Sequence, residues 1–217
     1  MIIAIDGPAG SGKSTTARKV AKRLGFIHIN TGAMYRGITY KIIEEKIDSS
    51  NMSKINNLLN NTLIEFYGPS DSILYMDGMD MSNKINSTSV TKNVSTISAI
   101  PDVREKMVKY QRQMALGKNV VLEGRDIGTI VFPNADFKFF LIADLNVRAE
   151  RRKKELQDED QNLSLQAIMD RLRDRDHKDA SRKHSPLIKA KDAIGLNTTN
   201  ISIEEQVNFI INTVNNN

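Results

Sequence analysis

The fold of this chain is decided by one stretch near its N-terminus, Gly7-Pro8-Ala9-Gly10-Ser11-Gly12-Lys13-Ser14. The stretch fits the pattern G-x-x-x-x-G-K-[ST] at every fixed position. An apolar run precedes it at residues 2–6, and residues 14–24 follow with apolar side chains on one helical face. In a strand–loop–helix unit of this kind, glycines let backbone N–H groups converge on phosphate oxygens, and the helix N-terminus adds positive charge. The stretch therefore predicts a phosphate-binding loop, or P-loop.

The side chains at the end of the loop predict how it would hold ATP. Lys13 supplies a mobile cation for the β- and γ-phosphates, Ser14 offers a hydroxyl to Mg²⁺, and Thr15 can donate to the α-phosphate. We expect Lys13 to be catalytic and Ser14 to be the metal ligand. The residues predicted to bind ATP with Mg²⁺ are Gly7, Pro8, Ala9, Gly10, Ser11, Gly12, Lys13, Ser14 and Thr15.

Working outward from the loop, apolar runs and helical patterns alternate along the chain. The apolar runs predict β-strands at residues 2–6, 26–30, 119–123, 137–143 and 193–197. Helical patterns occupy residues 14–24, with Gly25 as the stop, and residues 204–214. Most of the runs are continuous, as expected when both faces of a sheet are covered. This alternation predicts an α/β protein with a five-stranded parallel sheet between two layers of helices.

Two segments interrupt the alternation. Residues 35–110 are too long for a simple crossover and contain two predicted short strands, at 63–67 and 72–76, before a turn at Asp77-Gly78. They predict an inserted subdomain. Residues 147–190 are rich in both charges and poor in large apolar side chains, which favours a pair of solvated helices.

Composition narrows the classes of protein. The 217 residues include no cysteine, which excludes disulfides and thiolate metal sites. The formal net charge of +5 is compatible with binding to nucleic acid, to an acidic membrane surface or to phosphorylated small molecules. The alternative is that the charge has no functional meaning. The first apolar run leads straight into the glycine loop, unlike a signal peptide, and no apolar run is long enough to span a bilayer. We expect a cytoplasmic protein.

A P-loop binds nucleotide without choosing the reaction. The N-K-x-D guanine reader of GTPase switches is absent from the sequence. A motor ATPase usually ends an apolar strand in paired acids, whereas the strand predicted at 137–143 is followed by Asp144 and then Leu145. The single P-loop and the size of the chain favour a small-molecule kinase.

Four further motifs narrow the choice among kinases. They are Asn30-Thr31-Gly32-Ala33-Met34-Tyr35-Arg36, Pro101-Asp102-Val103-Arg104-Glu105, Gly124-Arg125-Asp126, and Arg175-Asp176-His177-Lys178-Asp179-Ala180-Ser181-Arg182. Together with the P-loop, and in this order, they resemble the motifs of bacterial cytidylate kinases over essentially the whole chain. The resemblance implies a P-loop kinase that transfers the γ-phosphoryl group of ATP to CMP, and to dCMP, in pyrimidine nucleotide metabolism.

The resemblance also implies an organisation within one kinase domain spanning residues 1–217. A core would comprise about 1–34, 111–146 and 191–217, with a CMP-binding insert at about 35–110 and a mobile lid at about 147–190. The expected partners are the nucleotides ATP and CMP or dCMP, with no nucleic acid and no membrane, and we expect a monomer.

The chemistry of cytosine supports two of the implied contacts. Asp126 can accept a hydrogen bond from the N4 amino group, and Arg104 can donate to the ring acceptors. By resemblance, Ser95 also contacts the base. The remaining implied roles are phosphate clamps at Arg36 and Arg125, a hydroxyl partner at Thr31, and sugar contacts at Arg175 and Asp179.

The charged segment opens with Arg148, Arg151 and Arg152, which resemble the lid arginines of nucleotide kinases. Arg151 and Arg182 are predicted to neutralise the charge that spreads over the transferring phosphoryl group. No general base is needed, because the acceptor is a phosphate oxygen that is already ionised at neutral pH.

Plainer interpretations remain open at this point. Arg125 and Asp126 could form an internal salt bridge, Arg175 and Asp179 a simple i, i+4 helix pair, and Arg104 a solvated helix start. An adenylate or shikimate kinase, or a nucleic-acid-binding ATPase, are the alternative functions. One position departs from the family pattern, because Asn30 stands where the family usually has Asp. This substitution puts in doubt a second contact to the metal.

Overall fold

The computed structural model describes residues 1–67, 73–157 and 163–216. Its centre is a five-stranded parallel sheet in the order β2-β6-β1-β7-β8. The strands are β1 (Ile2–Asp6), β2 (Ile27–Asn30), β6 (Val120–Gly124), β7 (Phe137–Ile142) and β8 (Ile194–Asn197). Each predicted strand is confirmed to within one residue at either end. The predicted α/β architecture with a parallel sheet is therefore correct.

Helices cover both faces of this sheet and complete the three layers. Alternate residues of β1 separate into two buried clusters: Ile3 and Ile5 face one way and Ala4 faces the other. On the side of Ile3 and Ile5 lie α1 (Lys13–Leu24) and α8 (Ile203–Asn215). On the side of Ala4 lie α2 (Thr31–Glu44) and α5 (Pro101–Ala115).

The predicted insert builds a second, antiparallel sheet with its own helices. The sheet comprises β3 (Ile64–Tyr67), β4 (Ile73–Met76) and β5 (Met79–Asp80), and the helices are α3 (Met52–Asn60) and α4 (Thr88–Ile97). Both predicted short strands are present, and the predicted turn lies between β4 and β5. Ser72, the first residue of the second predicted strand, lies outside the described residues.

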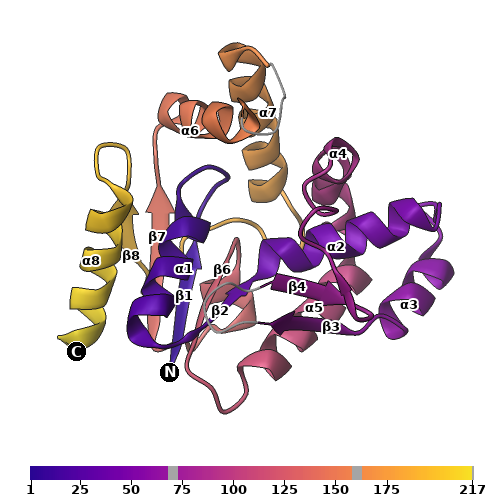
Figure 1. The fold of residues 1–217 in the computed structure, drawn as a ribbon, viewed down its shortest axis with the longest axis horizontal. Coiled ribbons are helices and arrows are strands. Elements are labelled where there is room, and N and C mark those ends of the chain that lie inside the picture. The colour runs from indigo at the N-terminus through magenta and orange to yellow at the C-terminus, as the bar shows by residue number, and fades with distance from the viewer. Residues whose placement is uncertain (68–72, 158–162, 217) are drawn as a thin grey trace.

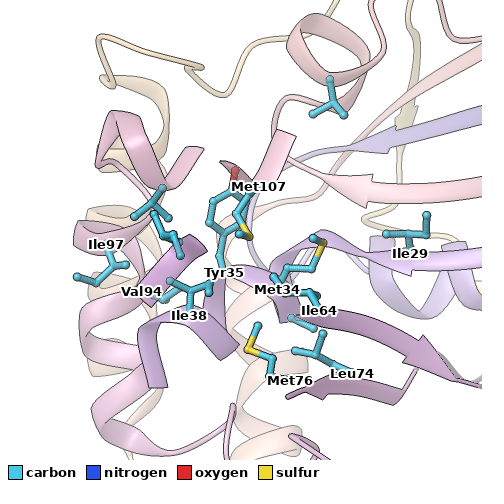
Figure 2. Packing of buried hydrophobic residues seen from close by; sticks show 14 of the residues in the cluster. Ile29, Met34, Tyr35, Ile38, Ile64, Leu74, Met76, Val94, Ile97 and Met107 are labelled. Carbon is cyan, nitrogen blue, oxygen red and sulfur yellow. The ribbon is translucent and has the colours of Figure 1, made fainter. Parts of the chain in front are cut away.

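One continuous core joins the insert to the main sheet. Figure 2 shows Ile64, Leu74 and Met76 of the small sheet beside Met34 and Ile38 of α2. The same buried cluster includes main-sheet residues such as Ile29. The predicted boundaries after residues 34 and 110 fall inside α2 and α5, so these two helices belong to both parts.

The charged segment forms two helices, α6 (Leu145–Gln157) and α7 (Leu165–Ala180). In Figure 1 they lie above the carboxyl ends of the strands, next to the loop that follows β1. The predicted pair of helices is present, but the helices are not fully solvated, because Ala149, Ile168 and Leu172 are buried in a small cluster with Ala9. Its role as a mobile lid stays a prediction. Within the described ranges, no helix combines the length and apolarity that a membrane crossing requires.

Candidate functional site

The sheet topology brings the sequence motifs to one edge. β6 pairs with both β1 and β2, and Asp6 at the end of β1 lies opposite Gly124 at the end of β6. The P-loop, the start of α2 and the Gly124-Arg125-Asp126 motif therefore leave the sheet side by side. Ligands of open parallel sheets bind at this edge, where neighbouring strands connect in opposite directions.

The P-loop has the backbone geometry that its glycines predict. Gly7 has a φ of 151°, and a Cβ there would lie 2.2 Å from the carbonyl oxygen of Leu141. Lys13 turns back over the loop, and its Nζ donates to the Pro8 carbonyl at 3.0 Å. Burial, and then the charge of Arg125, lowers the pKa of Lys13 to about 7. The loop therefore holds a desolvated cation that a phosphate group would stabilise.

A cavity beside the P-loop gathers most of the predicted acceptor residues. Those that line it are Thr31, Arg104, Arg125, Asp126, Arg175, Asp179 and Arg182. Ser95 lines an adjoining cavity, which also contains Arg175. Arg36 is near enough to Arg175 to repel its charge, and it donates to the carbonyl of Ile85 and the hydroxyl of Thr91. Residues from all four of the further motifs thus meet at one place.

Arg104 and Asp126 form a buried ion pair on one wall of the cavity. Arg104 Nη2 donates to Asp126 Oδ2, and only 5% and 4% of the two residues are exposed. Arg104 Nη1 also donates to the Ser98 carbonyl at 3.0 Å, and its guanidinium lies over the Tyr35 ring. Burial lowers the pKa of Arg104, but Tyr35 and Asp126 outweigh this effect and leave it above the ordinary value. Arg104 is therefore not a solvated helix start.

Asp179 is the centre of a second charged group on α7. Its Oδ2 accepts from Arg125 Nε at 2.8 Å, its Oδ1 accepts from Arg182 Nη2 at 2.5 Å, and it is 1% exposed. Burial raises the pKa of Asp179, but Arg125, Arg182 and Arg175 outweigh burial and hold it below the ordinary value. Arg125 therefore pairs with Asp179, and the internal Arg125–Asp126 salt bridge considered above is wrong.

Arg175 is left without a carboxylate hydrogen bond in this group. Its Nε is buried and has no partner within the part of the chain that the structure describes. Burial, together with the charges of Arg125 and Arg36, lowers the pKa of Arg175 to about 9. A simple Arg175–Asp179 helix pair is therefore not what the structure contains. The cluster instead carries more positive than negative charge, which favours binding of an anion.

The arginines of α6 lie in two different places. Arg148 Nη1 donates to the Ala9 carbonyl at 3.1 Å and to Asp176 Oδ2 at 2.5 Å. Arg151 instead donates to the carbonyl of Thr198, 2.6 Å from its Nη2. Thr198 in turn donates to the carbonyl of Ser11 at 3.0 Å. Arg151 thus reaches the P-loop only through Thr198 here, and its catalytic role stays a prediction. Sequence reasoning missed the direct contact of Arg148.

Asp6 is a second residue that sequence reasoning missed. Its carboxylate accepts from the backbone N–H of Ile127 at 2.9 Å and from that of Gly128 at 2.8 Å. It therefore fixes the chain directly after Arg125 and Asp126, where the π-helical turn η1 (Ile127–Val131) begins. Burial raises the pKa of Asp6 to about 6, although the two N–H groups oppose this shift. The signal in the sequence was an acidic residue closing an apolar strand.

The residues near Ser14 suit a metal that is held mainly by phosphate. Ser14 is exposed and lines the same cavity as Asn30. The side-chain oxygen of Asn30 accepts from the Ala33 N–H at 2.9 Å and so caps α2. Among the described residues, no three His, Cys, Asp or Glu side chains are grouped as a metal site. One hydroxyl with phosphate oxygens and water is a common environment for Mg²⁺.

Comparisons with known proteins agree with this geometry. A family model described as cytidylate kinase matches residues 3–216. The cytidylate kinase of Fusobacterium nucleatum subsp. nucleatum is 44% identical over 210 residues, which cover 97% of this chain and 95% of that protein. The cytidylate kinase of Clostridium tetani is 46% identical over 210 residues, covering 97% of this chain and 92% of that protein.

The fold also recurs in a distant solved structure. An uncharacterized protein from Eubacterium ventriosum aligns with a TM-score of 0.57 at 13% sequence identity. The alignment covers 100% of this chain and 99% of the other. At this level of identity the likeness concerns the fold alone.

Proposed function

This chain belongs to the cytidylate kinase family, and from that premise we propose how its residues transfer a phosphoryl group from ATP to CMP. The enzyme is a nucleoside monophosphate kinase that phosphorylates CMP with ATP. The observation that carries the residue assignments is the cavity beside the P-loop, where the Arg104–Asp126 pair adjoins the arginine cluster around Asp179. We expect dCMP to be a second acceptor.

The Arg104–Asp126 pair reads cytosine in this proposal. Each partner satisfies the other in the buried wall of the cavity. A cytosine base can donate from N4 to Asp126 and accept from Arg104 at its ring acceptors, and Ser95 adds a further contact. Uracil presents an acceptor in place of the N4 donor, which would face the carboxylate of Asp126. This mismatch should disfavour UMP by at least ~2–3 kcal/mol, roughly thirty- to hundredfold.

The arginine cluster holds the rest of the acceptor nucleotide. Arg36 and Arg125 clamp its phosphate, since a planar guanidinium matches two phosphate oxygens. Arg175 and Asp179 hold the sugar hydroxyls. Thr31 lies at the edge of the same cavity, where its hydroxyl donates to the Glu123 carbonyl at 2.7 Å. Its oxygen can also accept from a donor group near the acceptor phosphate.

Catalysis then rests on alignment and charge neutralisation. The attacking phosphate oxygen is already ionised, so no side chain has to remove a proton. Lys13 meets the β- and γ-phosphates, and Arg151 and Arg182 neutralise the charge on the transferring group. ATP use by this family implies a divalent metal, and we propose Mg²⁺ held by the Ser14 hydroxyl. When bound, it neutralises charge on the phosphate oxygens.

The acceptor assignment is tested by a coupled ADP-release assay with CMP, dCMP, UMP, AMP and shikimate. CMP should have the highest kcat/KM, and UMP should be roughly thirty- to hundredfold worse. Asp126→Asn should reduce the CMP/UMP ratio by at least about tenfold, because the carboxylate that rejects uracil is removed. Asp170→Asn is the matched control, since Asp170 is exposed and contacts Arg173 and Gln166 on the surface of α7. Equal kcat/KM for CMP and UMP in the wild type would rule out the proposed base reader.

The compartment and the oligomeric state of the enzyme are the last parts of this proposal. We propose that it works in the cytoplasm, where ATP and CMP are available, and that it does so as a monomer. Light scattering coupled to size exclusion should give a mass near the 24.4 kDa of one chain.

A further inference from the structure

Arg148 links three parts of the molecule through its guanidinium. Its Nη1 donates both to the Ala9 carbonyl in the P-loop and to Asp176 on α7, and its Nε donates to the Ala143 carbonyl at the end of β7. Arg148 is 8% exposed, so water hardly competes for these bonds. A Cβ on Gly10 would lie 3.1 Å from the Cβ of Arg148, which shows how closely α6 approaches the loop. The contact between α6 and the P-loop is therefore built into the interior.

One face of α7 continues this contact to the acceptor site. Leu172, Arg175, Asp176 and Asp179 follow one another at helical spacing and lie on the same side of the helix. Leu172 is buried in the small cluster that contains Ala9. Arg175 and Asp179 line the acceptor cavity, whereas Asp176 faces Arg148. A single helix face thus contacts the P-loop at one end and the acceptor cavity at the other.

We propose that Arg148 and Asp176 are positioning residues that couple ATP binding in the P-loop to CMP binding in the acceptor cavity. The inference rests on the proposed acceptor site. Phosphate binding draws the backbone N–H groups of the P-loop onto the ligand, and Ala9 belongs to that backbone. Any shift of the Ala9 carbonyl alters its bond to Arg148, and Asp176 passes the change to the turn of α7 that carries Arg175 and Asp179. Neither Arg148 nor Asp176 needs to touch a substrate.

The pair has the features that a coupling device requires. Asp176 Oδ1 is buried without a hydrogen-bond partner among the residues described, so Asp176 depends on Oδ2 and Arg148 for its compensation. The side chains of Arg148 and Asp176 are 9% and 22% exposed, so loss of the pair would leave a largely buried charge without its partner, which is costly. Coupling of this kind is reciprocal: ATP must tighten CMP binding by the same factor as CMP tightens ATP binding.

The test is calorimetric titration of CMP into the enzyme with and without a saturating non-hydrolysable ATP analogue and Mg²⁺. We expect the analogue to tighten CMP binding in the wild type by about fivefold or more. Asp176→Asn and Arg148→Lys should each reduce this factor to less than about twofold. Asp176→Asn removes the negative charge, and Arg148→Lys keeps the positive charge but replaces the guanidinium, which contacts Ala143, Ala9 and Asp176, with one ammonium group. Two variants are used so that misfolding of one does not decide the result. Asp170→Asn, an exposed change of the same kind on the same helix, should keep the wild-type factor.

The outcomes separate coupling from other roles. A wild-type factor of one, or an unchanged factor in both variants, would overturn the inference even if the variants were less stable to heat. Equal loss of coupling in Asp170→Asn would also overturn it, because the effect would then follow the charge of α7 and not the buried pair. If the wild type binds no CMP at all, the proposed acceptor site itself fails, and the inference fails with it.

Discussion

The Lys13 ammonium lies against the Pro8 carbonyl and is shielded from water, which is an unfavourable environment for a cation. The triphosphate of ATP would supply the missing negative charge. The burial of this single residue should therefore strengthen ATP binding. This role in binding phosphate explains why a lysine, and not an apolar residue, occupies a buried position at the first turn of α1.

Lys13→Ala should nearly abolish turnover without unfolding the protein. The variant loses the cation that meets the β- and γ-phosphates, but it also loses a desolvated charge, so its thermal stability should equal or exceed that of the wild type. Steady-state kinetics and thermal melts followed by circular dichroism measure the two effects. A folded variant that keeps more than about a tenth of the wild-type rate would remove Lys13 from the mechanism.

At this scale, the sequence predicted residue types better than it predicted pairs. The P-loop residues were identified from local spacing alone, because their function depends on adjacent backbone groups. The partners of Arg125 and Arg104 could not be found in this way: Asp179 and Asp126 reach them from other elements of the fold. Local spacing suggested Arg125–Asp126 and Arg175–Asp179 pairs, and the tertiary contacts replaced both.

At the scale of elements, α6 carries two arginines with different surroundings. Arg148 contacts the P-loop directly, whereas Arg151 holds the Thr198 carbonyl on the segment that follows β8. The sequence identified both as arginines that resemble those of a nucleotide kinase lid, but it could not predict that their contacts differ. The catalytic prediction for Arg151 requires it to leave Thr198 when nucleotides bind, which would involve a movement of α6.

Arg151→Ala should lower kcat at least about tenfold while changing the KM for CMP little, because its predicted contact forms with charge in the transition state. Steady-state kinetics at saturating ATP and CMP measure this effect, with Lys154→Ala, an exposed neighbour on α6, as the control. The rival expectation is that Arg151 only ties α6 to Thr198. In that case kcat would be unchanged and only the melting temperature would fall.

How well each helix or strand could be predicted depended on the apolar pattern that its own residues show. The strands of the main sheet are continuous apolar runs, because helices cover both of their faces, and they were predicted almost to the residue. In the insert, β3 and β4 were found, but α3, α4 and the two-residue β5 were not. The apolar side chains of α3 and α4 pack against α2 and α5, so their pattern is intelligible only once those neighbours are known. Both residues of β5 are exposed, so β5 offers no apolar pattern.

At the scale of the whole molecule, Asp6 should make stability depend on pH. Its pKa is about 6 in the folded protein and 3.8 as an ordinary aspartate, so the folded state binds this proton more tightly than the unfolded chain. The ionised form therefore lowers stability above about pH 6, and this loss is relieved as the pH falls from 6 toward 3.8. The shift corresponds to about 3 kcal/mol.

Asp6→Asn should remove this dependence. Denaturant unfolding of the wild type and the variant at several pH values between 4 and 7 isolates the contribution, because the other titrating groups are common to both proteins. The wild type should gain stability relative to Asp6→Asn as the pH falls. A constant difference across this range would show that Asp6 does not titrate as its burial predicts.

The continuous core through α2 has a consequence for how this enzyme could be rebuilt. Met34 and Ile38 pack against the small antiparallel sheet, yet they share one apolar cluster with Ile29 and Leu122 of the parallel sheet. The insert at residues 35–110 can therefore not be exchanged as an independent unit. A graft that exchanged residues 35–110 for the matching part of another kinase would keep Met34 but replace Ile38. The side chains of one packed core would then come from two different proteins and would not be matched to each other. Transplanting a new acceptor specificity into this scaffold would have to carry the whole of α2 and its buried neighbours.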